Sequence, residues 1–269
     1  MNRKFRFAGP FNFYPNDNKE IEAFIRKNEK TKNQKCKAIS VICPHAGYIF
    51  SAKTAIRVLE KINIPDRIIL IGPNHTGEGS RVATMIEGDW EIPGGIISID
   101  IDLASMLIKE SKYLKNDPIA HNHEHSLEVL LPLLHYFNPS ISIVPITLGD
   151  YSLPVIQDLT SVFLKAAQLF SSNFLVVASS DMSHYVSRET ANRKDELAFI
   201  AIRNLDGKDL LKTVQENNIS MCGSGPVAVV IDFAKHMGAK KATLVDYTDS
   251  GYVTGDTFSV VSYAGFIIE

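Results

Sequence analysis

Short β-rich runs alternate with longer helical patterns along this chain of 269 residues, and the alternation limits the fold more than any other feature. Several of the β-rich runs are continuously apolar, as strands covered by helices on both faces tend to be. The predicted strands are 38–43, 67–72, 141–147, 174–179, 242–248 and 258–268. The predicted helices are 51–62, 102–111, 126–137, 153–170, 189–205 and 225–238. The pattern predicts an α/β fold of three layers, in which helices flank a mainly parallel or mixed sheet.

The composition favours one domain over residues 1–269. With 45% hydrophobic residues and no internal repeat or linker, the chain can bury one substantial core. The formal net charge is −2 and the lysines are scattered, so we expect no nucleic-acid partner. No apolar run reaches the ~20 residues of a membrane span, and the first residues lack a signal-peptide pattern. Three cysteines without a C-x-x-C pair also indicate a reducing compartment, so we expect a cytoplasmic protein without membrane contact.

Polar clusters directly follow three of the predicted strands. PHAGY contains His45, GPNH contains His75, and SSDMSHY contains Asp181 and His184. In open α/β sheets, ligand sites form at the carboxyl ends of the strands. One loop histidine is usually a hydrogen-bonding turn residue, whereas two at equivalent strand ends favour metal ligation. Asp181 is spaced to orient His184 as a general base if the turn is helical, although a helix cap would use the same residue types.

Cys222 lies in MCGSGP, ahead of a predicted apolar helix. Its small neighbours allow backbone amides to approach a ligand, and a helix N-terminus lowers the pKa of a thiol. The resulting thiolate would bind a metal or attack an electrophile. The alternative is a buried cysteine that fills a tight turn, and the residues alone leave both interpretations open. No lysine follows the glycines, so the segment is not a P-loop.

The densest histidine cluster is HNHEH at 121–125, which matches the H-x-x-E-H pattern of inverted zinc metalloproteases. In a helix, His121 and His125 would share one face and bind zinc, with Glu124 as the general base. An Asp-Pro pair just upstream indicates instead that the helix begins close to His121 or after it. Matches of this length are common by chance. A zinc peptidase therefore stays an alternative, and the other motifs do not require it.

The motifs resemble the Memo family (mediator of ErbB2-driven cell motility), whose archaeal and bacterial members are often named AmmeMemoRadiSam system protein B. They cover nearly the whole chain in family order: PHAGYIFSAKTA, LIGPNHTGEGSRVAT, GDWEIPGG, AHNHEHSLEVLLPLL, VPITLG, SSDMSHY, CGSGPVA, SGYVTGD and VVSYAGF. At the N-terminus, AGPFNFYP carries extra residues relative to the family's A-G-x-F/W-Y-P. The resemblance implies a fold similar to that of class III extradiol dioxygenases, the non-haem iron enzymes that split catechol rings.

The resemblance also implies which residues form the site. The metal ligands carried over by motif are His45, His75 and Cys222, for iron(II) or copper. Residues implied to line the same pocket are Asp181, His184, and His125 or His121. The ring-cleaving dioxygenases use a carboxylate as the third ligand, so a softer cysteine ligand admits copper(I) and argues against ordinary catechol cleavage. His184 would match the base that takes the phenolic proton of the substrate.

Two classes of function follow from the resemblance. One is a redox or dioxygenase-like activity, dependent on the metal, toward an unknown small molecule. The other is a non-enzymatic module that binds a peptide or phosphopeptide in the same cleft, since eukaryotic members are described as binding phosphotyrosine peptides of a receptor. The family's association with radical-SAM and AMMECR-type proteins implies a functional link to them. No residue of the chain indicates this link by itself.

Overall fold

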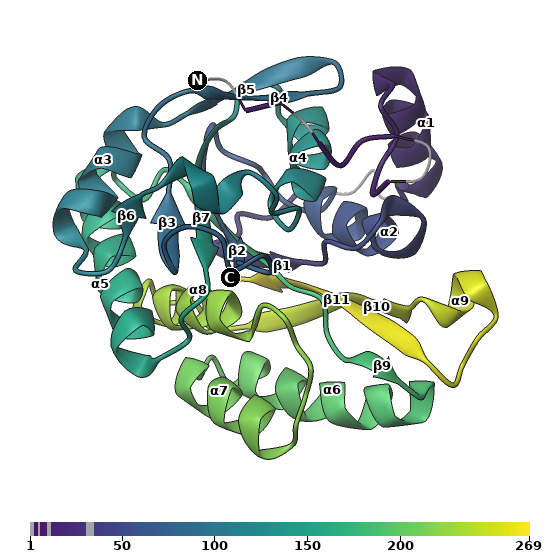
Figure 1. Cartoon of the computed structure of the whole chain (residues 1–269). Coiled ribbons are helices and arrows are strands. Elements are labelled where there is room, and N and C mark those ends of the chain that lie inside the picture. Colours follow the sequence, from purple (N-terminus) through teal and green to yellow (C-terminus); the bar gives the residue numbers. More distant parts are fainter. Residues whose placement is uncertain (1–2, 5, 10–11, 31–34) are drawn as a thin grey trace.

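The computed structural model describes residues 3–4, 6–9, 12–30 and 35–269 (Figure 1). In this part of the chain, the strands are β1 (Ser40–Cys43), β2 (Arg67–Pro73), β3 (Val82–Thr84), β4 (Asp89–Ile92), β5 (Gly95–Ile99), β6 (Lys115–Asn116), β7 (Ser142–Leu148), β8 (Leu175–Ser179), β9 (His184–Val186), β10 (Ala242–Asp249) and β11 (Val260–Ile268). They form one mixed, eleven-stranded sheet with the order β10-β11-β1-β8-β2-β7-β3-β6. The central strands β1, β8, β2 and β7 are parallel, β4 and β5 form a hairpin beside β7, and β9 pairs with β11.

Helices cover both faces of this sheet, which confirms the predicted three-layer α/β fold (Figure 1). Their bounds are α1 (Asn18–Asn28), α2 (Tyr48–Leu59), α3 (Ile101–Glu110), α4 (Leu131–Phe137), α5 (Leu153–Leu169), α6 (Arg188–Arg203), α7 (Gly207–Glu216), α8 (Ser224–His236) and α9 (Gly251–Thr254). On one side α2 packs on β1, β10 and β11, with α1 and α4 beside it. On the other side α8 packs on β1, β2 and β8, between α5 and α7. No described helix combines the length and apolar character that a membrane crossing requires.

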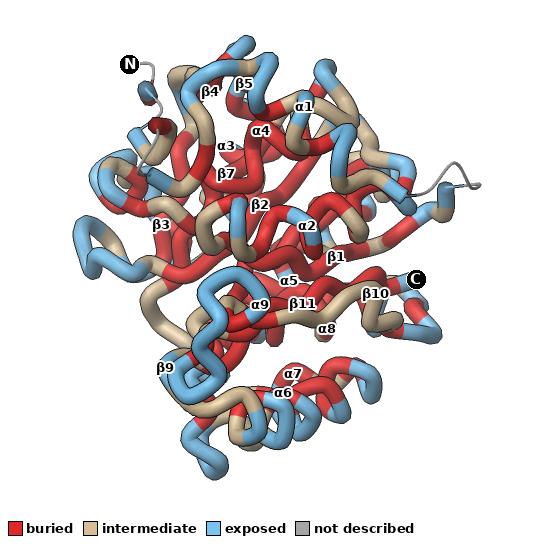
Figure 2. The backbone as a smooth tube through the Cα atoms, turned by 90° about the vertical axis from the view of Figure 1, so that its right-hand side faces the viewer, coloured by how far each residue is buried: buried red, intermediate tan, exposed pale blue. Residues whose placement is uncertain are grey.

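The buried apolar side chains form one connected cluster, which explains the strands that are apolar without interruption. β8 is buried along its whole length. β2 is buried at every position after its first, and Figure 2 shows it among the buried segments at the centre of the molecule. Leucine, isoleucine and valine dominate these strands. Branched side chains pack well on a pleated surface that is covered from both sides.

The predicted helix 126–137 is shorter than expected. A 3₁₀ turn, η2 (Glu128–Leu130), comes first, and the α-helix α4 begins only at Leu131. Pro132 lies in the first turn of α4, where its missing N–H costs no hydrogen bond. The amphipathic helices α1 and α7 and the short strands β3 to β6 and β9 were not predicted, because their apolar patterns are brief. Pro10 and Phe11 of the N-terminal AGPFNFYP motif lie outside the described residues.

The strand order brings the predicted polar clusters together. β8 lies between β1 and β2, and all three are parallel, so their carboxyl ends meet at one edge of the sheet. The pairing of Cys43 with Ser179 places the PHAGY and SSDMSHY loops next to each other. Gly72 at the end of β2 packs so closely that an added Cβ would lie 2.9 Å from Ser126 Oγ. The fold therefore gathers the predicted polar clusters at one edge of the sheet, the edge at which ligand sites form in open α/β folds.

Candidate metal centre

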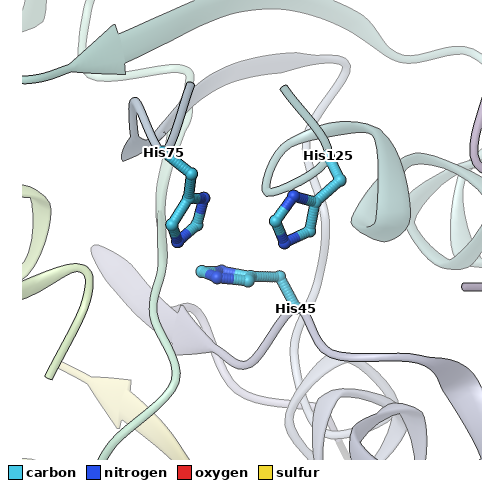
Figure 3. Close-up of side chains that lie close together, drawn as sticks. All are labelled: His45, His75 and His125. Carbon is cyan, nitrogen blue, oxygen red and sulfur yellow. The ribbon is translucent and has the colours of Figure 1, made fainter. Parts of the chain in front are cut away.

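Three imidazoles converge at this edge of the sheet (Figure 3). His45 follows β1, His75 follows β2, and His125 comes from the segment between the 3₁₀ turn η1 (Pro118–His121) and η2. One ligating nitrogen from each ring lies within 4.8 Å of the others. The rings of His75 and His125 are stacked with centroids 4.7 Å apart, and His45 lies edge-on to both. Such convergence from separate segments is what a metal ion requires.

His45 is the most buried of the three imidazoles. Its Nδ1 lies 2.7 Å from Ser179 Oγ, and that hydroxyl donates to the carbonyl of Ser126 at 2.6 Å. The hydroxyl is thus free to accept from His45, which places the proton on Nδ1 and leaves Nε2 with its lone pair. Burial lowers the pKa of His45 to about 3. The ring is therefore neutral at physiological pH, the form that binds a metal.

Glu124 orients His75. The backbone N–H of His75 donates to Glu124 Oε2 at 2.5 Å, and Nδ1 lies 2.9 Å from Oε1. Burial opposes ionisation of Glu124, but the hydrogen bonds from His75 and Ser126 lower the pKa of the carboxyl group to about 2. A carboxylate that accepts from Nδ1–H of a ligating histidine fixes the ring and makes its other nitrogen a better donor. The sequence predicts Glu124 as the base of a peptidase, whereas the structure makes it the partner of His75.

The loop that carries His75 is shaped by Asn74. Its Oδ1 accepts hydrogen bonds from Thr76 Oγ1 and from the N–H of Gly77, and its Nδ2 donates to the carbonyl of Glu78. This is an Asx turn, and Gly77 within it has a φ of 69°, which favours glycine. Asn74 therefore builds the turn, while His75 and Glu124 face each other.

His125 completes the trio from the HNHEH segment. Its Nδ1 lies 3.5 Å from Glu124 Oε1, so one carboxylate faces two of the histidines. The ring of Phe13 covers it at a centroid distance of 4.4 Å. Burial lowers the pKa of His125 to about 4. All three rings thus turn Nδ1 toward an oxygen of the protein, and this leaves Nε2 as the nitrogen suited to a metal.

Cys222 borders the trio on the side of His45. Its Sγ lies 3.4 Å from His45 Nε2 and accepts from the N–H of Asp181 at 3.3 Å. The sequence predicts a lowered thiol pKa at the start of α8, but burial and the nearby Asp181 carboxylate raise the pKa of Cys222. Loss of hydration outweighs the helix dipole here. Without a bound cation the thiol is therefore protonated, while its position next to His45 Nε2 still suits a ligand.

Asp181 and His184 lie in the same neighbourhood but do not form the predicted pair. The Asp181 carboxylate accepts from the N–H of His45 at 2.8 Å, and its other oxygen lies 4.0 Å from His45 Nε2. Burial raises the pKa of Asp181. His184 begins β9, so there is no helical turn to join the two; its Nδ1 lies 2.8 Å from the carbonyls of Met182 and Ser220. Those carbonyls favour the proton on Nδ1, which leaves the lone pair of the neutral ring on Nε2.

Comparison with known proteins decides the family. The Memo-like protein family matches residues 3–267 of the chain. The chain belongs to the Memo family. A MEMO1 family protein of Methanopyrus kandleri is 36% identical over 100% of this chain and 99% of its own length. Another from Aquifex aeolicus is 40% identical over 95% of each chain. The resemblance drawn from the sequence motifs is thus confirmed.

A solved structure supports the fold of this Memo-family chain. The crystal structure of an uncharacterised protein from Escherichia coli K12 matches with a TM-score of 0.53 over 85% of this chain and 99% of that one. The two sequences are 14% identical, so the likeness concerns the fold alone. It agrees with the mixed, mostly parallel sheet between two helical layers described above.

His121 lies apart from the histidine trio of this Memo-family chain. Its ring is fully buried and packs edge-on against Trp90 at 5.8 Å. Neither ring nitrogen has a hydrogen-bond partner among the described residues. Residues 122–127 form no helix, so His121 and His125 do not share the helix face that an H-x-x-E-H peptidase needs. His123 is exposed and pairs with Glu78.

The donor set suits a metal ion. Imidazole nitrogens are common ligands of iron, copper and zinc, and a neighbouring sulfur favours the softer of these ions. The trio that the structure brings together is His45, His75 and His125, with Cys222 beside it. The resemblance implied His45, His75 and Cys222 as ligands, with His125 or His121 near the metal. The geometry makes His125 an equal candidate ligand and places His121 beside Trp90.

Proposed function

We propose that this Memo-family protein binds a redox-active metal ion, iron(II) or copper, at His45, His75, His125 and Cys222. The observation that carries the proposal is the convergence of the three imidazoles, whose ligating nitrogens lie within 4.8 Å of one another. His45 and His75 each have an oxygen within hydrogen-bond distance of Nδ1, as is usual for ligating histidines, and His125 Nδ1 lies 3.5 Å from Glu124 Oε1. A bound ion would supply redox chemistry and open coordination positions for a small-molecule substrate.

In this proposal, the residues around the metal ligands handle protons. His184 carries its proton on Nδ1, so its Nε2 is free to take a proton from an acidic substrate group. The Asp181 carboxylate accepts a hydrogen bond from the backbone N–H of His45, and its second oxygen lies 4.0 Å from His45 Nε2. His184 is thus the proposed base, and Asp181 a proposed acid–base group or partner of the bound ligand. The substrate would be a small molecule that reaches His184 and the histidine trio at the same time.

Metal content and dioxygen consumption test this function. Wild-type protein and His75→Ala are to be purified anaerobically, incubated with iron(II) or copper(I), desalted and analysed for bound metal. We expect about one ion per wild-type chain and at least a tenfold weaker affinity in the variant, because one ligand and its carboxylate support are lost. Dioxygen consumption with reductant present is expected only from the loaded wild type.

His123→Ala is the matched control, because His123 lies in the same segment as His125 but is 58% exposed and faces Glu78. It should bind metal like the wild type. Equal and negligible binding of both ions by the wild type and His75→Ala would refute the metal centre. Peptide capture that needs an intact pocket but no metal would then favour the binding module.

A further inference from the structure

Glu128 is a buried carboxylate outside the histidine trio, and its partners in the described residues come from the N-terminus. Its Oε2 accepts from Arg3 Nη1 at 2.6 Å, and the two side chains are 0% and 4% exposed. Its Oε1 accepts from the Tyr14 hydroxyl and from the N–H groups of Arg6 and Phe7, each at 2.8 Å. Such a carboxylate is a strong anchor, because removal of a partner leaves a buried charge uncompensated.

Arg3 extends this anchor along the HNHEH segment. Its Nε donates to the carbonyl of His121 at 2.9 Å, and its Nη2 donates to the carbonyl of Glu124 at 3.1 Å. Its guanidinium also lies 4.0 Å above the ring of Trp90. Arg3 and Glu128 together tie the N-terminus to both ends of the segment that carries His125.

Two aromatic side chains from the same N-terminal residues cover His125. The ring of Phe13 lies 4.4 Å from that of His125, and the ring of Phe7 lies 5.7 Å away, edge-on. The carbonyl of Phe13 accepts from the N–H of Tyr48 at the start of α2. We call Arg3, Arg6, Phe7, Phe13 and Tyr14 the N-terminal strap. In Figure 1 the described N-terminal residues, in purple, begin beside β4, where Arg3 bridges to Trp90, and continue toward α1.

We propose that the N-terminal strap closes the histidine trio on the side of His125, and that Glu128 is the positioning residue that holds it closed. The rings of Phe7 and Phe13 cover part of His125 and leave 21% of its side chain exposed. The buried Arg3–Glu128 pair sets the free energy of opening. Release of the strap would admit solvent, metal or substrate from this side. The consequence for a bound metal rests on the proposed function, whereas the closure itself does not.

Chemical labelling of metal-free protein tests the closure. Glu128→Gln keeps the size of the side chain but removes its charge, so Arg3 loses its partner. Diethyl pyrocarbonate modifies accessible imidazoles, and mass spectrometry resolves the rate for each histidine. We expect His125 to be modified about tenfold faster in the variant, because loss of the ion pair raises the population of the open strap. The exposed His123, two residues away, should react at an unchanged rate.

Two further variants separate closure from general destabilisation. Glu110→Gln is the matched control, since it breaks the exposed pair with Lys165 and should leave the labelling of His125 unchanged. Tyr14→Phe removes a single donor to Glu128 and should accelerate labelling to a smaller extent. Slow hydrogen exchange in β2 and β8 must persist in each variant, which shows that the core stays folded. Unchanged labelling of His125 in folded Glu128→Gln would overturn the proposal. If Glu128→Gln does not fold, unchanged labelling of His125 in Tyr14→Phe would overturn it instead.

A metal-release measurement distinguishes the two proposals. In protein loaded with iron(II), Glu128→Gln should keep the wild-type stoichiometry but release the ion to a chelator about tenfold faster. Equal release rates despite faster labelling would show that the strap does not control the metal and would overturn that part of the inference. A wild type that binds no metal would defeat the proposed function alone, because the labelling of His125 still tests the closure.

Discussion

His121 and His125 lie four residues apart in one motif, yet their environments differ. His125 faces His45 and His75, whereas His121 is enclosed beside Trp90 with both ring nitrogens unpartnered in the described structure. A buried imidazole without an acceptor for its charged form resists protonation. Burial, with a contribution from Arg3, accordingly lowers the pKa of His121 to about 3. The contribution of His121 to the stability of the fold should therefore depend strongly on pH.

We expect His121→Phe to make the protein less sensitive to acid. The folded pKa of His121 lies below the unfolded value, so its contribution to stability is complete above about pH 6.5 and is lost as pH falls. That loss amounts to about 1.4 kcal/mol for each pH unit in this window, and phenylalanine abolishes it. Urea unfolding at about pH 7 and about pH 5 measures the difference. His123→Phe, at an exposed site, is the control, and its free energy of unfolding should depend on pH as that of the wild type does. The same pH dependence in wild type and His121→Phe would contradict the prediction.

At the scale of elements, the close contact between the start of α8 and the end of β8 fixes the position of the Cys222 sulfur. Gly223 directly precedes α8, and a Cβ added there would lie 2.4 Å from the carbonyl oxygen of Ser179 and 2.5 Å from Cβ of Ser180. Its φ of −100° is ordinary for any residue, so the need for glycine is steric. The close approach holds Cys222 against Asp181 and His45. The CGSGP motif therefore serves the packing of α8 on the end of β8.

We expect Gly223→Ala to destabilise the fold by roughly 1–3 kcal/mol, because two segments of backbone must move apart to admit the methyl group. Chemical denaturation measures the loss, and metal affinity should fall with it as Cys222 shifts. Gly149→Ala is the matched control, since its added Cβ would meet neighbours at 3.5 Å or more, which is ordinary contact. Equal stability of the two variants would argue against the steric explanation.

At the scale of the whole molecule, the candidate site joins segments that are distant in sequence. His45, His75 and His125 come from three loops, and Cys222 comes from a fourth. Only the folded chain brings nitrogens of the three imidazoles within 4.8 Å of one another and places Cys222 beside His45. The edge of the sheet at which they meet is fixed by the parallel order β1-β8-β2.

Metal binding should therefore stabilise the folded state. A ligand that binds only the folded chain adds about 2.7 kcal/mol at a free concentration of 100 times its Kd. We expect this gain in the urea unfolding of wild-type protein with iron(II) or copper(I), and its reversal by a chelator. His75→Ala should gain far less. A gain of the same size in both proteins would mean that the ion binds elsewhere.

Much of the architecture could be predicted because it depends on local patterns. The β-rich runs, several of them continuously apolar, predicted six of the strands. The polar motifs that follow three of them predicted the site edge with His45, His75, Asp181 and His184. The motif order predicted the Memo family. The strands and the site edge follow from side-chain periodicity and from the polar residues at strand ends, which each segment carries in its own sequence. The family follows from the resemblance of the motifs.

Tertiary packing alone decided the roles within the HNHEH segment. The residues of that segment carry no information on which neighbours they meet: His125 meets the trio, Glu124 meets His75, and His121 meets Trp90. Packing also reversed the predicted shift of the Cys222 pKa, because the loss of water at a buried thiol outweighs the local helix dipole. Burial and long-range contacts set ionisation and ligand geometry, and both arise only when the chain is folded.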